Sequence, residues 1–176
     1  MIIIIMNKIY KVEFQTSRGN FIVEVDPSLS PLGAERFLEL VKDRFFNNTP
    51  IYRIIPAFLM QFGISLDDSK KHWHNKTIID DNNVNVKVSK YSLCFAGCGP
   101  DTRTTNLFIA FRTLNWLGNS PWETPFGKVI EGTEVVDEFQ ASSHQLDQVQ
   151  LKNNSEEYIN NNDLHNIDKI ISVSII

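Results

Sequence analysis

Apolar and polar residues alternate along residues 9–25. The alternation has a period of two, which is typical of β-strands with one buried face. It is interrupted by Ser17-Arg18-Gly19-Asn20, where Gly-Asn provides turn chemistry. The apolar positions are Val12 and Phe14 before this turn and Phe21, Val23 and Val25 after it. This pattern predicts a β-hairpin.

The period changes to three and four after Ser30. Ser30 suits an N-cap and Pro31 a first helical residue, and the apolar positions that follow are Ala34, Phe37, Leu38 and Val41. An amphipathic helix is therefore predicted from Pro31 to about Asp43. A second helix, of two to three turns, is predicted around 135–139.

Residues 52–63, YRIIPAFLMQFG, combine a dense apolar run with one charged residue, Arg53. Because apolar residues occur at both odd and even positions, the run predicts a strand that is covered on both faces. Alternation places Arg53 on the same side as Ile51 and Ile55, so the guanidinium should emerge beside apolar surface. Two interpretations stay open: an arginine held by a buried carboxylate or carbonyls, and a functional arginine.

Three further strands are predicted at 92–96, 106–111 and 169–176. The segment 141–168 is Asn-rich and polar, a composition that alone would suggest a disordered linker. Its apolar residues are spaced like anchors to a core, so we predict that it is ordered. These residues are Leu151, Tyr158, Ile159, Leu164 and Ile167.

The length of 176 residues fits one domain, 1–176, in which residues 1–8 form a short extension or leading strand. The net charge of −4 and the absence of a Lys/Arg block argue against nucleic acid as a partner. The start, MIIIIM, has no basic flank and is too short to span a bilayer. We therefore expect no membrane partner, a cytoplasmic location and a monomer.

Two other groups of residues could carry chemistry. Cys94 and Cys98 lack a second ligand pair, so we expect them to be reduced and structural, without a metal. His72 and His74 could bind a metal from one side of an extended segment, although no acidic or Cys ligand stands beside them. Asp80-Asp81 could serve in acid–base chemistry, but capping of a turn is the simpler interpretation.

The run 52–63 resembles the signature of the cyclophilins, F-H-R-x-I-P-x-F-x-x-Q-x-G. Six positions match at the family spacing: Arg53, Ile55, Pro56, Phe58, Gln61 and Gly63. A second stretch, 91–110, resembles the family pattern L-S-x-A-x-x-G-P-x-T-x-x-S-Q-F-F-I. Its matching positions are Ala96, Gly99, Pro100, Thr102, Phe108 and Ile109, and Pro125-Phe126-Gly127 matches a third family motif.

Within that family the chain looks most like a subgroup recognised by G-P-N-T-R-T-T-Q-x-F-I-N, which reads GPDTRTTNLFIA here. The subgroup also shows Q-F-G-I-S, then W and D-D. This chain has residues 61–65, Trp73 and Asp80-Asp81 in the same order. The subgroup has a segment similar to 141–168 as well, with a short helix and a return strand. The resemblance implies that 169–176 is this return strand and that it pairs with the first hairpin.

The resemblance implies a mainly β fold, a closed eight-stranded antiparallel barrel capped by two helices. It implies peptidyl-prolyl cis–trans isomerisation of Xaa-Pro segments in client proteins, without a cofactor. The expected catalytic residues are Arg53, Phe58, Gln61 and Asn106. The expected substrate-binding residues are Leu59, Ala96, Gly97, Phe108, Trp116, Leu117 and Trp122. Two alternatives are a cyclophilin-like module that binds Pro-containing partners with little turnover, and a barrel that binds a metal or other ligand through His72 and His74.

Several residues depart from the family pattern. Asn106 replaces a Gln and shortens the amide, Gly97 replaces an Asn, and Phe62 replaces a small residue and should narrow the groove. The loop 116–127 is about two residues longer than the common form, and no His stands where the family places one. We therefore expect cyclosporin to bind weakly.

Overall fold

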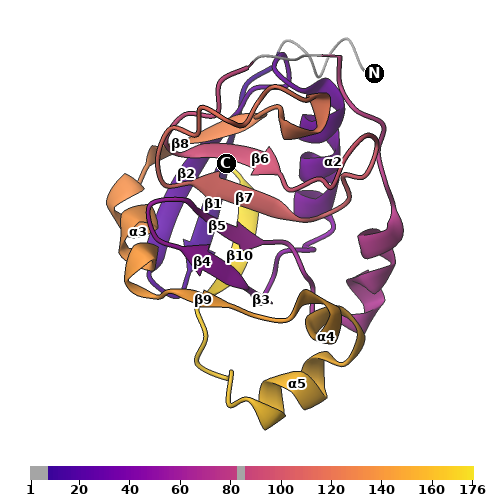
Figure 1. The fold of residues 1–176 in the computed structure, drawn as a ribbon, viewed down its shortest axis with the longest axis vertical. Helices are drawn as coiled ribbons and strands as arrows, with labels where there is room; N and C mark the ends of the chain where they lie inside the picture. Colours follow the sequence, from indigo (N-terminus) through magenta and orange to yellow (C-terminus); the bar gives the residue numbers. More distant parts are fainter. Residues whose placement is uncertain (1–7, 83–85) are drawn as a thin grey trace.

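The computed structural model describes residues 8–82 and 86–176, which form one curled sheet with helices around it (Figure 1). The strands are β1 Tyr10–Thr16, β2 Gly19–Val25, β3 Thr49–Pro50, β4 Arg53–Ile55, β5 Leu59–Phe62, β6 Ser92–Phe95, β7 Leu107–Ala110, β8 Gly127–Glu131, β9 His144–Gln145 and β10 Lys169–Ile175. The α-helices are α2 Pro31–Lys42, α3 Thr133–Glu138, α4 Gln148–Asn153 and α5 Ser155–Asn161. The 3-10 helices are η1 Asp68–Asn75, η2 Pro121–Glu123 and η3 Phe139–Ala141. The predicted leading strand at 1–8 lies almost entirely outside the described residues.

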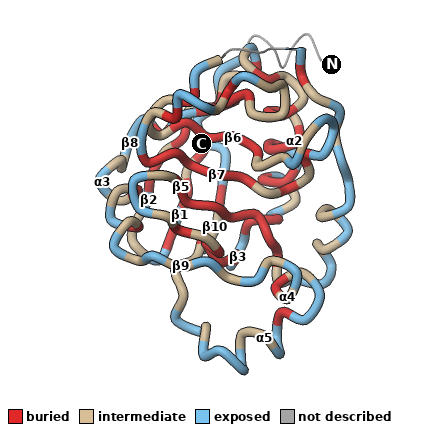
Figure 2. The backbone as a smooth tube through the Cα atoms, in the orientation of Figure 1, coloured by how far each residue is buried: buried red, intermediate tan, exposed pale blue. Residues whose placement is uncertain are grey.

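The predicted hairpin at the start is confirmed, since β1 pairs antiparallel with β2 from Tyr10↔Val25 to Thr16↔Gly19. The last strand returns to the first, because β10 pairs with β1, as predicted. Inward residues of these strands, among them Phe14 and Phe21 with stacked rings 4.8 Å apart, fill the central core. Figure 2 shows buried backbone concentrated in the middle of the sheet and exposed backbone at the periphery.

The mainly β fold is confirmed, but the closed eight-stranded barrel is wrong in count and in closure. Ten strands follow the order β3-β10-β1-β2-β8-β6-β7-β5-β4-β9, with β3 and β9 at the two ends. The extended segment 49–55 is divided into β3 and β4, because Ile51 N–H donates to Asp168 and Tyr52 N–H to Gln61, in different neighbours. The two-residue strand β9 then extends the order beyond β4.

Helix α2 begins at Pro31 and ends at Lys42, as predicted, but Ser30 does not cap it with its own side chain. A distant carboxylate does so instead. Asp81 Oδ1 accepts from Leu32 N–H at 2.8 Å, and Asp81 Oδ2 accepts from Gly33 N–H at 3.2 Å and from the Ser30 hydroxyl. Negative charge is favourable at this end of a helix dipole.

The predicted order of the polar segment 141–168 is confirmed by α4 and α5. Leu151 is fully buried in a small apolar cluster with Tyr52 and Ile64, against which Tyr158 and Ile159 also pack. Helix α3 fulfils the second helical prediction at 133–138. Among residues 8–82 and 86–176, no helix is long and apolar enough to cross a membrane.

Candidate active site

The run 52–63 is a tight hairpin rather than the single strand that the sequence suggests. Strand β4 ends at Ile55, Phe58 N–H donates to Ile55 O at 3.0 Å, and β5 returns from Leu59. The turn needs Ala57 in a left-handed conformation, with φ of 58°. The hairpin pairs Arg53 with Gln61, so both side chains leave the same face of the sheet.

The same face continues across two more strands. Gln61 pairs with Phe108 of β7, and Phe108 pairs with Cys94 of β6. Arg53, Gln61, Phe108 and Cys94 therefore form one row across four strands. The neighbouring row, Ile54, Met60, Ile109 and Leu93, points to the other face and belongs to the central core.

A separate apolar cluster covers the face that carries Arg53. We call it the outer cluster. It consists of the buried residues Leu59, Val88, Cys94, Phe108, Ala110 and Leu114, with Phe58, Ala96 and Leu117 partly buried against them. Five of the predicted site residues, Phe58, Leu59, Ala96, Phe108 and Leu117, thus meet in one cluster on this face.

Arg53 reaches this cluster with much of its hydrogen-bonding capacity unused. Its Nη1 donates to Gln61 Oε1 at 2.7 Å, and its central carbon lies 5.9 Å from the Phe58 ring centroid. Its Nε is buried without a hydrogen-bond partner in the described part of the chain. Across these residues Arg53 also forms no ion pair, so the buried ion-pair interpretation is wrong for this arginine.

Trp116 stands at the rim of the outer cluster. Its side chain is 53% exposed, and its ring centroid lies 6.0 Å from that of Phe58. The guanidinium carbon of Arg112 lies 5.3 Å from the centroid of the same Trp116 ring. The Phe58 ring therefore neighbours both the catalytic candidate Arg53 and the exposed Trp116.

The other predicted site residues, Asn106, Gly97 and Trp122, border the outer cluster near Ala96. Asn106 accepts from Ala96 N–H through its backbone at 2.9 Å, while its side-chain Oδ1 is buried without a partner among the described residues. Gly97 faces Trp122, because a Cβ on this glycine would lie 3.2 Å from Trp122 Cβ. The small residue at Gly97 is thus what makes room for Trp122.

Comparison with known proteins decides the family. The family model "Cyclophilin type peptidyl-prolyl cis-trans isomerase/CLD" matches residues 11–170. The chain belongs to the cyclophilin-type isomerases. It is 32% identical to a peptidyl-prolyl cis–trans isomerase of Acinetobacter baylyi over 72% of this chain and 69% of the relative. It is 33% identical to peptidyl-prolyl cis–trans isomerase-like 3 of Dictyostelium discoideum over 72% and 79%.

Solved structures agree with this family at the level of the fold. A cyclophilin-type isomerase of Cryptosporidium parvum matches with a TM-score of 0.71 at 21% identity, covering 96% of this chain and 98% of that one. The same Cryptosporidium protein in the presence of the dipeptide Ala-Pro matches with a TM-score of 0.70, also at 21% identity, over 94% and 98%. The chain is therefore an isomerase of the cyclophilin type with the fold of that family.

One residue of this cyclophilin that sequence reasoning did not single out is Arg103. Its side chain has no exposed surface, and it donates to Asp80 from Nε, to Ser30 and Asp81 from Nη1, and to Ile79 O from Nη2. Asp81 therefore joins Arg103 to the start of α2. Asp80 binds Arg103 and also accepts from Asp101 N–H at 2.9 Å, so the expected capping of a turn describes Asp80 but not Asp81. The spacing of Asp80-Asp81 and the loop TRTT carried the signal, but only as a motif.

Phe62 corrects another expectation. Strand alternation turns it away from the row of Arg53 and Gln61, and it is fully buried in the central core. Its ring lies 5.9 Å from that of Phe14 and 6.0 Å from that of Phe46. Phe62 therefore does not narrow the site.

The two histidines of η1 interact with backbone groups of their own loop. His74 Nε2 accepts from Ser65 N–H at 3.1 Å, and burial lowers its pKa to about 4. His72 Nδ1 lies 3.0 Å from Ser69 O. Within residues 8–82 and 86–176 no group of three or more His, Cys, Asp or Glu is placed to hold a metal.

Both cysteines are free thiols. Cys94 is buried in the outer cluster, and burial raises the pKa of its thiol. Cys98 is exposed, so a structural role fits Cys94 and not Cys98.

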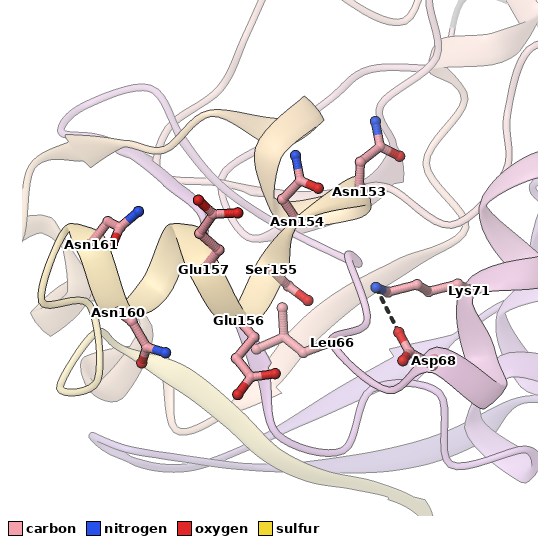
Figure 3. Close-up of a pocket in the computed structure, with 10 residues that line it drawn as sticks. All are labelled: Leu66, Asp68, Lys71, Asn153, Asn154, Ser155, Glu156, Glu157, Asn160 and Asn161. Atoms are coloured by element: carbon pink, nitrogen blue, oxygen red, sulfur yellow. Dashed lines mark ion pairs between the residues drawn. The ribbon is translucent and has the colours of Figure 1, made fainter.

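A hollow of about 620 Å³ lies between η1 and the helices α4 and α5 and shares no lining residue with the outer cluster (Figure 3). Its lining is dominated by asparagines and acidic residues of 153–161, and Lys71 pairs with Asp68 at 2.7 Å. It has no aromatic wall for a proline ring. The outer cluster beside Arg53 is the better candidate for the isomerase site.

Proposed function

We propose that this chain catalyses rotation about Xaa-Pro peptide bonds on the outer cluster, with Arg53 as the catalytic residue. The single observation that supports this assignment is the state of the Arg53 guanidinium. It is a permanent cation beside the apolar cluster, held by one neutral partner, Gln61, with its Nε unpaired. Charged donors that are kept without a carboxylate are available to a substrate.

The reduction of the activation barrier that catalysis requires is small enough for such a site to supply. Peptide-bond rotation has a barrier of ~18–20 kcal/mol. A turnover on the order of 10³ s⁻¹ corresponds to roughly 13 kcal/mol, so the site must supply about 6 kcal/mol. No bond is made or broken, and neither a nucleophile nor a general acid is required.

A guanidinium can supply this stabilisation because the barrier arises from amide resonance. When the bond twists, the prolyl nitrogen becomes pyramidal and its lone pair can accept a hydrogen bond. The fork of Arg53 can hold a substrate carbonyl and aim another donor at that nitrogen, and its charge strengthens both bonds in a site shielded from water. An interaction made only in the twisted state lowers the barrier without tightening ground-state binding.

The remaining residues take supporting roles in this proposal. Phe58, Leu59, Phe108 and Leu117 would bind the proline ring, since they share the outer cluster. Gln61 would orient Arg53 through the 2.7 Å bond. Asn106 would offer its unpaired Oδ1 to a substrate N–H, and Ala96 and Trp116 would border the bound peptide.

Exchange spectroscopy on a short Ala-Pro peptide tests the function directly. The choice of peptide is suggested by the dipeptide present with the Cryptosporidium structure. Catalysed exchange of the cis and trans prolyl signals is expected at micromolar enzyme. Binding without exchange would instead favour a module that recognises Pro-containing partners with little turnover, and the proposal would fail.

We also propose weak binding of cyclosporin. Trp122 packs against Gly97, and the loop 116–127 places no histidine beside the outer cluster. A calorimetric titration should give an affinity weaker than nanomolar, whereas nanomolar binding would refute this proposal. The free thiols of Cys94 and Cys98 support a reducing, cytoplasmic location for a monomer that acts on client Xaa-Pro segments.

Membership of the subgroup with the GPxTRTT loop is likewise a proposal. What supports it is that Arg103 of this loop and Asp80-Asp81 are bonded to one another. Trp73, another residue of the subgroup pattern, lies against helix α2, because the guanidinium of Arg36 on that helix is 5.2 Å from the Trp73 ring.

A further inference from the structure

The turn that presents Phe58 contains an unusual backbone conformation. Ala57 has φ of 58°, in the left-handed region where a Cβ approaches the carbonyl that follows it. Glycine adopts this region without the steric cost. Ala57 is also exposed, so packing around its own side chain does not hold it there.

A side chain from a distant element bonds this residue. Gln140 of η3 accepts from Ala57 N–H through Oε1 at 2.8 Å, across 83 positions of sequence. The turn therefore has a hydrogen bond that its own residues do not supply, beside the internal bond from Phe58 N–H to Ile55 O.

The orientation of the Gln140 amide is fixed from its other end. Its Nε2 donates to Asp137 Oδ1 at 3.3 Å. The second oxygen of that carboxylate accepts from Tyr91 O–H at 2.7 Å and from Lys90 Nζ at 3.1 Å. Since Asp137 takes the amide nitrogen, the amide oxygen is left to face Ala57.

What the turn positions is the aromatic side chain that adjoins Arg53. Phe58 follows Ala57 directly, and its carbonyl accepts from Phe111 N–H at 2.9 Å. Its ring lies 5.9 Å from the guanidinium carbon of Arg53 and 6.0 Å from the Trp116 ring. A shift of Ala57 would therefore move the Phe58 ring relative to the cation.

We propose that Gln140 is a positioning residue of the isomerase site: by holding Ala57 left-handed, it sets the place of the Phe58 ring beside Arg53. Asp137 orients Gln140 for this purpose. The inference rests on the proposed function, since the ring matters for catalysis only if proline binds on the outer cluster.

A double-mutant cycle between Gln140→Leu and Ala57→Gly tests it. In the wild-type background Gln140→Leu should lower kcat/KM about tenfold, less than the ~10²-fold cost of a full 1 Å misplacement. In the Ala57→Gly background the same change should lower it less than about threefold, because glycine keeps the left-handed turn unaided. Gln148→Leu on α4, a residue outside the hydrogen bonds that join Ala57, Gln140 and Asp137, is the matched control and should leave kcat/KM unchanged.

A second readout does not depend on catalysis. Wild-type Phe58 ring signals in NMR spectra should shift in Gln140→Leu and return toward their original positions in the double variant. Equal losses of kcat/KM in both backgrounds, or an unmoved Phe58 ring, would overturn the role of Gln140. Absent turnover in the wild type with the ring shifts as expected would instead refute the proposed function and leave the positioning intact.

Discussion

Two arginines of this chain have the same functional group and opposite environments. Arg103 has no exposed side-chain surface, and its three nitrogens donate to Asp80, Asp81, Ser30 and a backbone carbonyl. Arg53 is partly exposed, donates to the neutral Gln61, and keeps a buried Nε unpaired. The first guanidinium is fully used by the fold, whereas the second keeps donor capacity that the described residues do not use.

The difference shows two ways in which a protein can accommodate a cation beside apolar side chains. A buried charge is tolerated when carboxylates and hydrogen bonds compensate it, as at Arg103. A cation kept without a counter-charge beside apolar side chains is costly for stability and is typical of functional sites. Substitutions at three positions, Arg103, Arg53 and Gln61, can break or sharpen this contrast.

The largest effect is expected from Arg103→Met. Its loss would leave Asp80 and Asp81 as buried charges without a cation, which costs ~3–5 kcal/mol of unfolding free energy. Urea denaturation measures the change. Arg112→Met, which removes an exposed arginine that stacks on Trp116, is the matched control and should shift stability by less than about 1 kcal/mol. Equal stability of the two variants would contradict the assigned role of Arg103.

Arg53→Ala should have the reverse signature. Loss of one charged donor that acts only in the twisted state costs ~2.7–4 kcal/mol, or roughly 10²–10³ in kcat and in kcat/KM alike. The melting temperature should stay near that of the wild type, because no ion pair is broken. Arg53→Lys should recover only part of the activity, since a point charge cannot hold carbonyl and nitrogen together. A folded Arg53→Ala protein with normal turnover would refute the mechanism.

Gln61→Glu converts Arg53 toward the condition of Arg103. A carboxylate at the position of Oε1, now 2.7 Å from Nη1, would form an ion pair with the guanidinium and compete with the substrate carbonyl. We expect kcat/KM to fall about tenfold while stability changes by no more than ~1 kcal/mol. Gln61→Met, of similar length and without charge, separates capture of Arg53 from simple loss of the amide. Activity above that of Gln61→Met would contradict capture.

The smallest effect concerns a side chain that can lose its charge, as the arginines cannot. Burial lowers the pKa of His74 from 6.5 to about 4, and its Nε2 accepts from Ser65 N–H. Folding therefore favours the neutral imidazole. This contribution is fully present above pH 6.5 and is lost as the pH falls toward 4, because the unfolded chain takes up the proton first.

Urea midpoints at pH 7, 5.5 and 4.5 check this dependence. His74→Gln keeps an acceptor for Ser65 and should show a flatter decline over this range. Parallel declines in the two proteins would show that His74 does not contribute to it.

Much of the fold could be predicted from the sequence, because strands and helices produce different periods of apolar residues along the chain. The hairpin at 9–25 follows from alternation and turn residues, and helix α2 from its apolar spacing and Ser30-Pro31. The return of β10 to β1 follows only from the resemblance to the subgroup. The row from Arg53 to Phe108 could be anticipated only through a family motif, because Gln61 of β5 pairs with Phe108 of β7, 47 positions further along the chain. Asn106 by itself is not informative.

What could not be read depends on contacts between distant segments. Nothing local to Asp81 says that it caps α2, and nothing local to Gln140 says that it bonds Ala57. The division of 49–55 into two strands likewise depends on which neighbour each backbone N–H finds. The inward direction of Phe62 follows from its alternation with Gln61 along β5, which the family position alone does not indicate.

The remote cap of α2 has a consequence for how the protein is made. The first helical N–H groups find their acceptor in Asp81, which lies 49 positions after Leu32. At synthesis rates of ~5–20 residues per second, this carboxylate leaves the ribosome about 2 to 10 s after the helix. Arg103, which neutralises it, follows later still. The N-terminal end of the nascent helix therefore lacks this cap until Asp81 has been synthesised. The N-terminal third of the chain reaches its final form only after the middle has been translated.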